Sequence, residues 1–94
     1  MTDIQRIAHY EELLDRVTEA AGELEAALEK FRSVQDDAAA LAAYYESGDW
    51  RRDFEDDEAG RLPPDLKRGV LSEDAVYNAL SDNDRLSAVL KALE

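Results

Sequence analysis

A repeat of eight apolar side chains at heptad spacing covers the first third of the chain, and it constrains the fold more than any other feature. The two heptad positions hold Ile7, Leu14, Ala21 and Leu28, and Tyr10, Val17, Leu24 and Phe31. This spacing is typical of an amphipathic helix, and three further apolar residues beside it widen the stripe to that of a core-facing helix. Because Thr2 and Gln5 have the spacing of a capping box, the sequence predicts a helix from residue 2 to about residue 32.

A second, shorter helix is predicted directly after the first. Its apolar residues repeat at helical spacing: Val34, Ala38, Leu41 and Tyr45. Ser33 and Asp36 form another pair with capping spacing, and Gly48 is of a residue type that often stops a helix. With a tight turn near Ser33, residues 2–47 would form a long antiparallel helical hairpin, which is the arrangement that we favour.

One unbroken helix is the alternative to this hairpin. No proline or glycine interrupts residues 23–47, so a single helix of about 45 residues is compatible with the sequence. A helix of that length would need a partner chain to cover its apolar stripe. The first helix is therefore the segment through which we would expect a homodimer to form.

Residues 48–71 lose this periodicity and are predicted to form an ordered loop. From Tyr44 to Glu58 the chain holds four of its seven aromatic residues and seven acidic side chains, and Pro63 and Pro64 follow. A loop with so many aromatic and apolar side chains needs a surface to pack on. We therefore expect this loop to be ordered.

Residues 72–94 are predicted to form two short helices that pack across the hairpin. Ser72 is a good N-cap for the first of them, and the two acidic residues after it suit the positive end of a helix. The second short helix, over about residues 83–93, has one apolar face made by Leu86, Val89, Leu90 and Leu93. The predicted fold class is all-α, with residues 1–94 as a single helical domain.

The composition excludes several classes of protein. Without cysteine the chain can form neither a disulfide nor a thiolate zinc site. No stretch approaches the ~20 apolar residues of a membrane-spanning helix, and the N-terminus lacks the apolar core of a signal peptide, so we expect a cytoplasmic protein. A net charge of −12 disfavours direct binding to nucleic acid or to an anionic membrane.

Two signature runs follow one another between residues 44 and 74. The first consists of Tyr44, Tyr45, Ser47, Gly48, Trp50, Asp53 and Phe54. The second consists of Asp57, Glu58, Gly60, Leu62, Pro63 and the ten residues from Asp65 to Asp74. With the long helical segment before them, these runs resemble the small bacterial proteins catalogued as domain of unknown function 4298. The resemblance implies a small bacterial protein with a helical N-terminal half and implies no particular activity.

Five residues of these runs are candidates for binding a partner protein: Trp50, Asp53, Phe54, Lys67 and Arg68. Trp50 and Phe54 lie four apart, so one helical turn would place both on one face. There they would either pack onto the hairpin or anchor a partner, because tryptophan and arginine dominate the energetics of interfaces. The basic pair Lys67 and Arg68 would either latch onto the acidic surface of the chain itself or bind an acidic group of a partner.

The acidic residues between positions 49 and 58 have the composition of a cation site but not its spacing. Counted from Asp53, an EF-hand loop would place Glu58 where glycine is needed and Pro64 where a bidentate glutamate is needed. We expect these acids to pair with nearby basic residues or to stay solvated, and we predict no metal and no cofactor. The single histidine, His9, lies in no catalytic motif, so we predict no catalytic residues.

These observations predict a non-enzymatic protein-interaction module with a protein partner. The alternative is an acidic mimic of nucleic acid, in which carboxylates along one face imitate phosphates and capture a basic DNA-binding protein.

Overall fold

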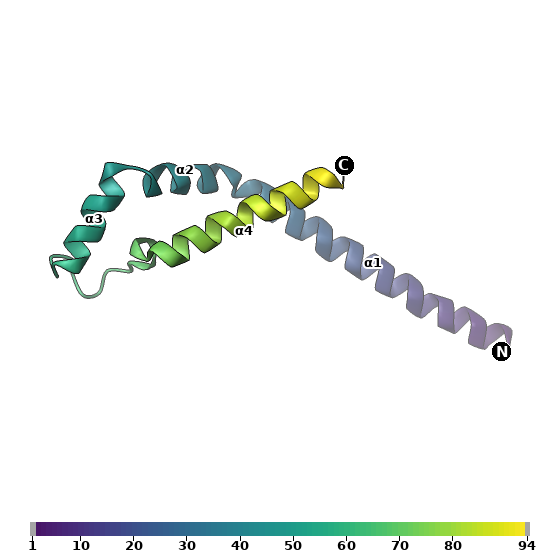
Figure 1. The fold of residues 1–94 in the computed structure, drawn as a ribbon. Coiled ribbons are helices and arrows are strands. Elements are labelled where there is room, and N and C mark those ends of the chain that lie inside the picture. Colours follow the sequence, from purple (N-terminus) through teal and green to yellow (C-terminus); the bar gives the residue numbers. More distant parts are fainter. Residues whose placement is uncertain (1, 94) are drawn as a thin grey trace. The chain divides into compact units, whose positions relative to one another are not determined.

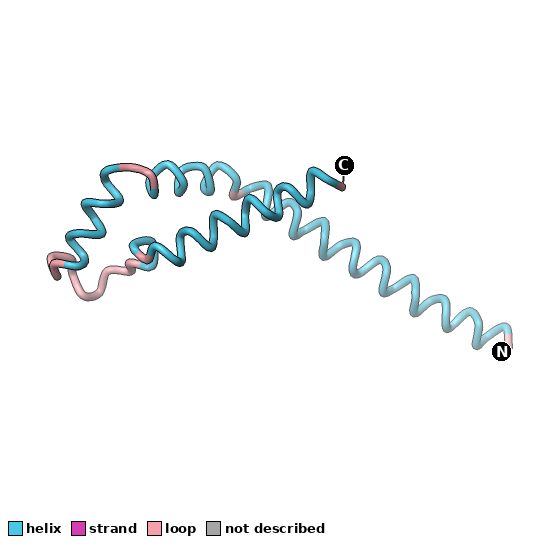
Figure 2. Tube along the Cα trace, in the orientation of Figure 1, coloured by secondary structure: helices cyan, strands magenta, loops and turns pink. Residues whose placement is uncertain are grey.

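The chain is all-α, as the sequence predicts. The computed structural model describes residues 2–93, and most of them are helical (Figure 2). The elements are α1 (Asp3–Ser33), α2 (Gln35–Tyr45), α3 (Gly48–Glu58), the 3₁₀ turn η1 (Gly69–Leu71) and α4 (Glu73–Ala92). No strand occurs between residues 2 and 93. The chain divides into two compact units, Met1–Gln35 and Asp36–Glu94, which we call the N-terminal and C-terminal units.

The N-terminal unit consists of α1, which begins at the predicted capping box. The Thr2 hydroxyl accepts a hydrogen bond from the Gln5 amide (3.2 Å), and the Gln5 side-chain oxygen accepts one from the Thr2 amide (2.9 Å). This reciprocal pair satisfies two of the backbone donors that a helix leaves free at its start. No residue of α1 is buried, because the unit holds no second element to cover the heptad stripe.

The predicted break near Ser33 is confirmed. Val34 has φ −102° and ψ 7°, and its amide donates to the last carbonyls of α1. The Ser33 hydroxyl donates to the Lys30 carbonyl (2.7 Å), and the Gln35 side-chain amide donates to the Phe31 carbonyl (2.9 Å). These bonds satisfy carbonyls at the end of α1 locally. The antiparallel packing of α1 and α2 stays a prediction, since the two helices belong to different units.

The segment predicted as a loop contains a helix of 11 residues, α3. Gly48 does not stop α2 but is the first residue of α3, and the Ser47 hydroxyl caps the new helix by accepting from the Trp50 amide (3.3 Å). No proline or glycine lies between this start and Gly60, where φ is +71° and the chain leaves the helical region. The serine cap and the uninterrupted run of eleven residues explain the helix, although its sequence has no continuous apolar stripe.

The two short helices predicted at the C-terminal end are one helix of 20 residues, α4. The cap at Ser72 is as predicted, with its hydroxyl accepting from the Ala75 amide (3.3 Å). The polar stretch at residues 81–84, which resembles a turn in the sequence, continues the helix instead. Asp82 and Arg85 lie one turn apart on its surface and form an ion pair (3.6 Å), which is a favourable spacing within a helix.

The C-terminal unit has a very small core. Its chain runs out along α2 and returns along α4, with α3, a loop and η1 between them (Figure 1). In the described part of the chain only Leu71 (7% exposed) and Val76 (3% exposed) are buried. Leu71 ends η1, which packs against both α3 and α4. Few apolar residues of this unit are therefore fully buried, and polar contacts between α3 and the segment at residues 61–71 add to its packing.

Candidate functional site

A hydrogen bond from Trp50 ties α3 to η1. The Trp50 indole nitrogen donates to the Val70 carbonyl at 2.9 Å, across 20 residues of sequence. The indole ring also contacts Tyr45 edge-on (centroids 5.1 Å apart) and stacks on Phe54 (5.3 Å). The i,i+4 spacing of Trp50 and Phe54 therefore places both rings on one face of α3, as predicted.

A second tie joins the end of α3 to the segment that follows it. The Arg68 guanidinium donates to the Asp57 carboxylate (2.8 Å) and to the Pro64 carbonyl (3.3 Å). Both charged side chains are about two-thirds covered, since 32% of Arg68 and 28% of Asp57 is exposed. Arg68 is thus the internal latch that the sequence suggested.

The acidic end of α3 explains why arginines gather there. Asp56 and Asp57 lie in the last turn, where the negative end of the helix dipole makes carboxylates unfavourable. Arg61 pairs with Asp56 (3.0 Å) as Arg68 pairs with Asp57, and each pair offsets this repulsion. The prediction that these acids pair with neighbouring basic residues is confirmed for both.

Tyr44 and Asp53 form the third tie, between α2 and α3. The Tyr44 hydroxyl donates to the Asp53 carboxylate at 2.5 Å. This hydrogen bond, together with partial burial and the nearby negative charge, raises the pKa of Tyr44 to about 12. The proton therefore stays on Tyr44 throughout the physiological range, and the bond holds the last turn of α2 against α3.

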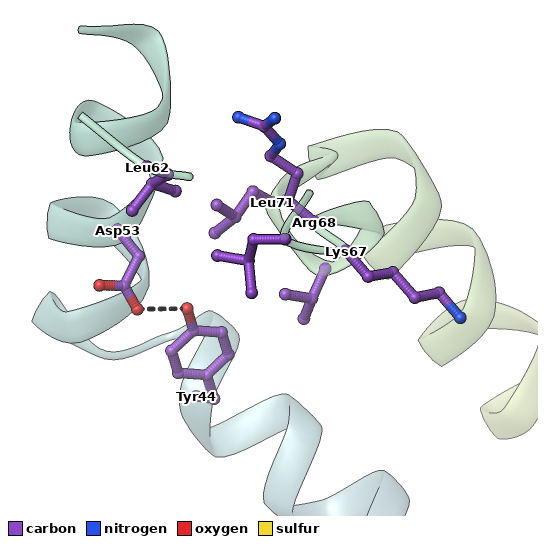
Figure 3. Close-up of a pocket in the computed structure, with 8 residues that line it drawn as sticks. Tyr44, Asp53, Leu62, Lys67, Arg68 and Leu71 are labelled. Carbon is purple, nitrogen blue, oxygen red and sulfur yellow. Dashed lines mark hydrogen bonds between the residues drawn. The ribbon is translucent and has the colours of Figure 1, made fainter. Parts of the chain in front are cut away.

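Residues of these ties line a pocket of about 320 Å³, and Figure 3 shows its lining together with the Tyr44–Asp53 hydrogen bond. It is lined by Tyr44, Asp53, Leu62, Leu66, Lys67, Arg68, Val70 and Leu71. Four of these side chains are aliphatic, and the Tyr44–Asp53 pair supplies the polar edge. The Lys67 chain extends away from that pair in Figure 3, so its ammonium group is not directed at Asp53.

The pocket brings together three of the five predicted binding residues. Asp53, Lys67 and Arg68 line it, whereas Trp50 and Phe54 stack beside each other outside its lining. The other five lining residues, Tyr44, Leu62, Leu66, Val70 and Leu71, are not among the five predicted binding residues. Each of these is an aliphatic or aromatic residue close in sequence to a candidate polar residue. This pattern is too common in proteins to identify a site.

The acidic residues do not gather around a common point. Within residues 2–93 no group of three or more histidine, aspartate or glutamate side chains is arranged to hold a metal ion. The pocket contains one carboxylate, Asp53, and that group already accepts a hydrogen bond. What this arrangement can do chemically is accept an apolar group beside a negative charge.

The fold and the pocket define a small all-α protein whose second half is tied together by a few polar contacts. None of the helices described is long and apolar enough to span a membrane. The chain belongs to the family described as Domain of unknown function (DUF4298), whose sequence model matches residues 7–92. The match takes in most of α1 as well as the whole signature region, and it confirms the family resemblance. No curated protein and no solved structure matches the chain significantly.

Proposed function

We propose that this protein is a non-enzymatic, cytoplasmic protein-interaction module whose pocket binds a basic segment of a partner protein. The observation that carries the proposal is the pocket itself, with four aliphatic side chains and the Asp53 carboxylate. Of its two basic residues, Arg68 is paired with Asp57 and Lys67 extends away from Asp53 (Figure 3). Its walls are fixed in advance by hydrogen bonds from Tyr44, Trp50 and Arg68. A site that needs little ordering on binding loses less free energy when its ligand arrives.

The size of the pocket supports an amino-acid side chain as its occupant. A volume of about 320 Å³ is at the low end of the range for ligand pockets, about 300–1,000 Å³. An aliphatic or aromatic side chain of the partner would cover Leu62, Leu66 and Val70. Leu66 in particular is exposed in the free protein and would gain from being covered.

The net negative charge of the C-terminal unit supports a basic partner. Residues 36–94 hold 15 acidic and seven basic side chains. Tyr44 donates to one oxygen of Asp53, Oδ2, so Oδ1 remains as an acceptor for a lysine or arginine of the partner. A negative field of this kind steers cationic segments toward the site and penalises acidic ones.

A pair of matched leucine variants tests the proposal. Leu66→Glu places a charge in the pocket, and Leu93→Glu places the same charge on the exposed end of α4, outside the pocket. A protein captured from the native host by the wild type is purified and titrated against each variant. We expect Leu66→Glu to weaken binding about tenfold or more, because the partner's apolar side chain would have to cover the new carboxylate and remove its water.

Three controls make the result interpretable. Leu93→Glu should bind like the wild type, and the Trp50 emission spectrum of both variants should match the wild type if the fold is intact. Binding should also weaken as salt is raised, since a cationic partner is expected. Equal binding of Leu66→Glu and the wild type would remove the pocket from the interface.

The mimicry alternative lacks a comparable observation. A nucleic-acid mimic needs free carboxylates along a continuous face, whereas four of the six acids in α3 are engaged by other side chains. The engaged acids are Asp49 by Arg52, Asp53 by Tyr44, Asp56 by Arg61 and Asp57 by Arg68. We therefore favour the interaction module.

A further inference from the structure

The heptad stripe of α1 has no cover within its own unit. Its members Leu14 (58% exposed), Val17 (68%) and Leu24 (59%) present most of their surface to solvent. All eight heptad positions between Ile7 and Phe31 are apolar or aromatic. An apolar strip this long on one face of a helix marks a packing surface.

Helix length indicates what covers the strip. A helix rises about 1.5 Å per residue, so the 31 residues of α1 span roughly 46 Å. The 20 residues of α4 span about 30 Å, and the 11 residues of α2 span about 16 Å. Among the described helices, only α1 of a second copy has both the length and the heptad spacing to cover four consecutive heptads.

The area of the strip is sufficient for a stable pair. Full burial of a large aliphatic side chain stabilises by about 1.5–3 kcal/mol at roughly 25 cal/mol per Å², which corresponds to about 60–120 Å² for each side chain. Seven of the eight positions carry a large aliphatic or aromatic side chain, all but Ala21, and together they offer on the order of 400–850 Å² per copy. A specific interface buries about 800 Å² per partner.

Charge complementarity favours a parallel pair over an antiparallel one. With Ile7 at position a and Tyr10 at position d, Arg6 is at g and Glu11 at e. In a parallel pair, g faces the e position of the next heptad in the other helix, so Arg6 meets Glu11 of the second copy twice by symmetry. In an antiparallel pair, position e of one helix faces position e of the other. If the eight apolar heptad residues of each helix are all paired, Glu11 would face Glu25 of the second copy, and the two negative charges would repel each other.

We propose that α1 forms a parallel two-stranded coiled coil with α1 of a second copy of this chain. The pair would bury the stripe from Ile7 to Phe31, whereas all residues that line the pocket belong to the C-terminal unit. Two copies would then present two pockets, which raises the apparent affinity for a partner with two binding segments. The dimer itself does not depend on the pocket, so each proposal can fail without the other.

Measuring the molar mass in solution tests the dimer. The chain has a mass of 10.5 kDa, and light scattering with size exclusion should give about twice this value for the wild type. Leu24→Glu places a charge at a d position and should give a monomer. Ala26→Glu places the same charge on the opposite face, where it can pair with Lys30 one turn later, and should remain dimeric.

Two further measurements separate folding effects and orientation. Trp50 lies in the other unit, so an unchanged emission spectrum in Leu24→Glu would show that the C-terminal unit is intact. The chain has no cysteine, so an Ile7→Cys variant carries one thiol. Oxidation should cross-link two copies in a parallel pair, since facing a positions are within disulfide reach. A monomeric wild type would overturn the proposal, a mass of three or more copies would overturn the two-stranded pair, and failure of Ile7→Cys to cross-link would overturn its parallel orientation.

Discussion

The latch between Arg68 and Asp57 should contribute measurably to the stability of the C-terminal unit. The two groups are 2.8 Å apart, both are about two-thirds covered, and Arg68 also donates to the Pro64 carbonyl. Exposed ion pairs are worth about 0.2–1 kcal/mol, and hydrogen bonds to charged groups about 1.5–3 kcal/mol. A double-mutant cycle with Arg68→Met and Asp57→Asn should therefore give a coupling free energy of about 1–2 kcal/mol.

The two single variants should differ in a direction that the helix dipole sets. Asp57→Asn loses the latch but also removes a negative charge from the negative end of α3. Removing that charge stabilises the helix by about 0.3–1 kcal/mol. Arg68→Met loses the latch and leaves that charge without a partner. We expect Arg68→Met to be the more destabilising of the two in urea unfolding followed by Trp50 emission.

The pair between Arg61 and Asp56 is a control within the same helix end. Its distance is 3.0 Å, close to that of the latch, but 69% of Arg61 is exposed. Solvent screening should reduce its coupling to about 0.5 kcal/mol or less. If both cycles give the same coupling, coverage by the surrounding chain is not what strengthens the latch, and our reasoning is refuted.

Four further predictions concern other contacts. Trp50→Phe keeps an aromatic ring but loses the hydrogen bond to Val70, so circular dichroism in urea should show a loss of about 0.5–1.5 kcal/mol; a variant as stable as the wild type would contradict this tie. Tyr44 has a pKa of about 12 in the folded protein, against 10.0 unperturbed. The stability that its protonated form contributes is fully present below pH 10 and is lost as pH rises toward 12. The late part of the tyrosinate absorbance should therefore be smaller by the contribution of one tyrosine in Tyr44→Phe. Gly60→Ala places a side chain at φ +71°, and this should cost about 1–2 kcal/mol; an unchanged midpoint of thermal unfolding would contradict it. Finally, each copy carries a charge of −12, so sedimentation should show tighter dimerisation at 0.15 M than at 0.01 M salt, where repulsion extends to about 30 Å; weaker association at higher salt would show that attraction between charges dominates.

The sequence predicts the helices best where two local signals agree. In α1 a capping box and four apolar heptads indicate the same helix. Its observed start at Asp3 and end at Ser33 are close to the predicted bounds. In α3 the signals disagree, because Ser47 caps a run of residues that are mostly charged. The apolar periodicity is absent in α3 because its contacts with residues 61–71 include hydrogen bonds and ion pairs, made by Trp50, Asp56 and Asp57. In α4 the polar residues 81–84 resemble a turn, but the helix continues because its apolar face resumes at Leu86.

The pocket could not be predicted in the same way. Leu62, Leu66 and Val70 are spaced four apart, but Pro63 and Pro64 lie within that run and residues 61–68 form no helix. The three residues meet because Arg68 and Trp50 hold the segment after α3 against that helix. Asp53, Lys67 and Arg68 were identified from their residue types within the signature. Their aliphatic neighbours become part of a site only through contacts that are remote in the chain.

A core of two residues has a consequence for how sequences with this fold can diverge. With only Leu71 and Val76 buried among residues 2–93, few substitutions in the C-terminal unit can empty or overfill an interior. A saturation scan of this unit should therefore tolerate changes in side-chain volume widely and resist changes in hydrogen bonding at Tyr44, Trp50 and Arg68. In most small domains the least replaceable positions are aliphatic, whereas here they should be polar or amphipathic.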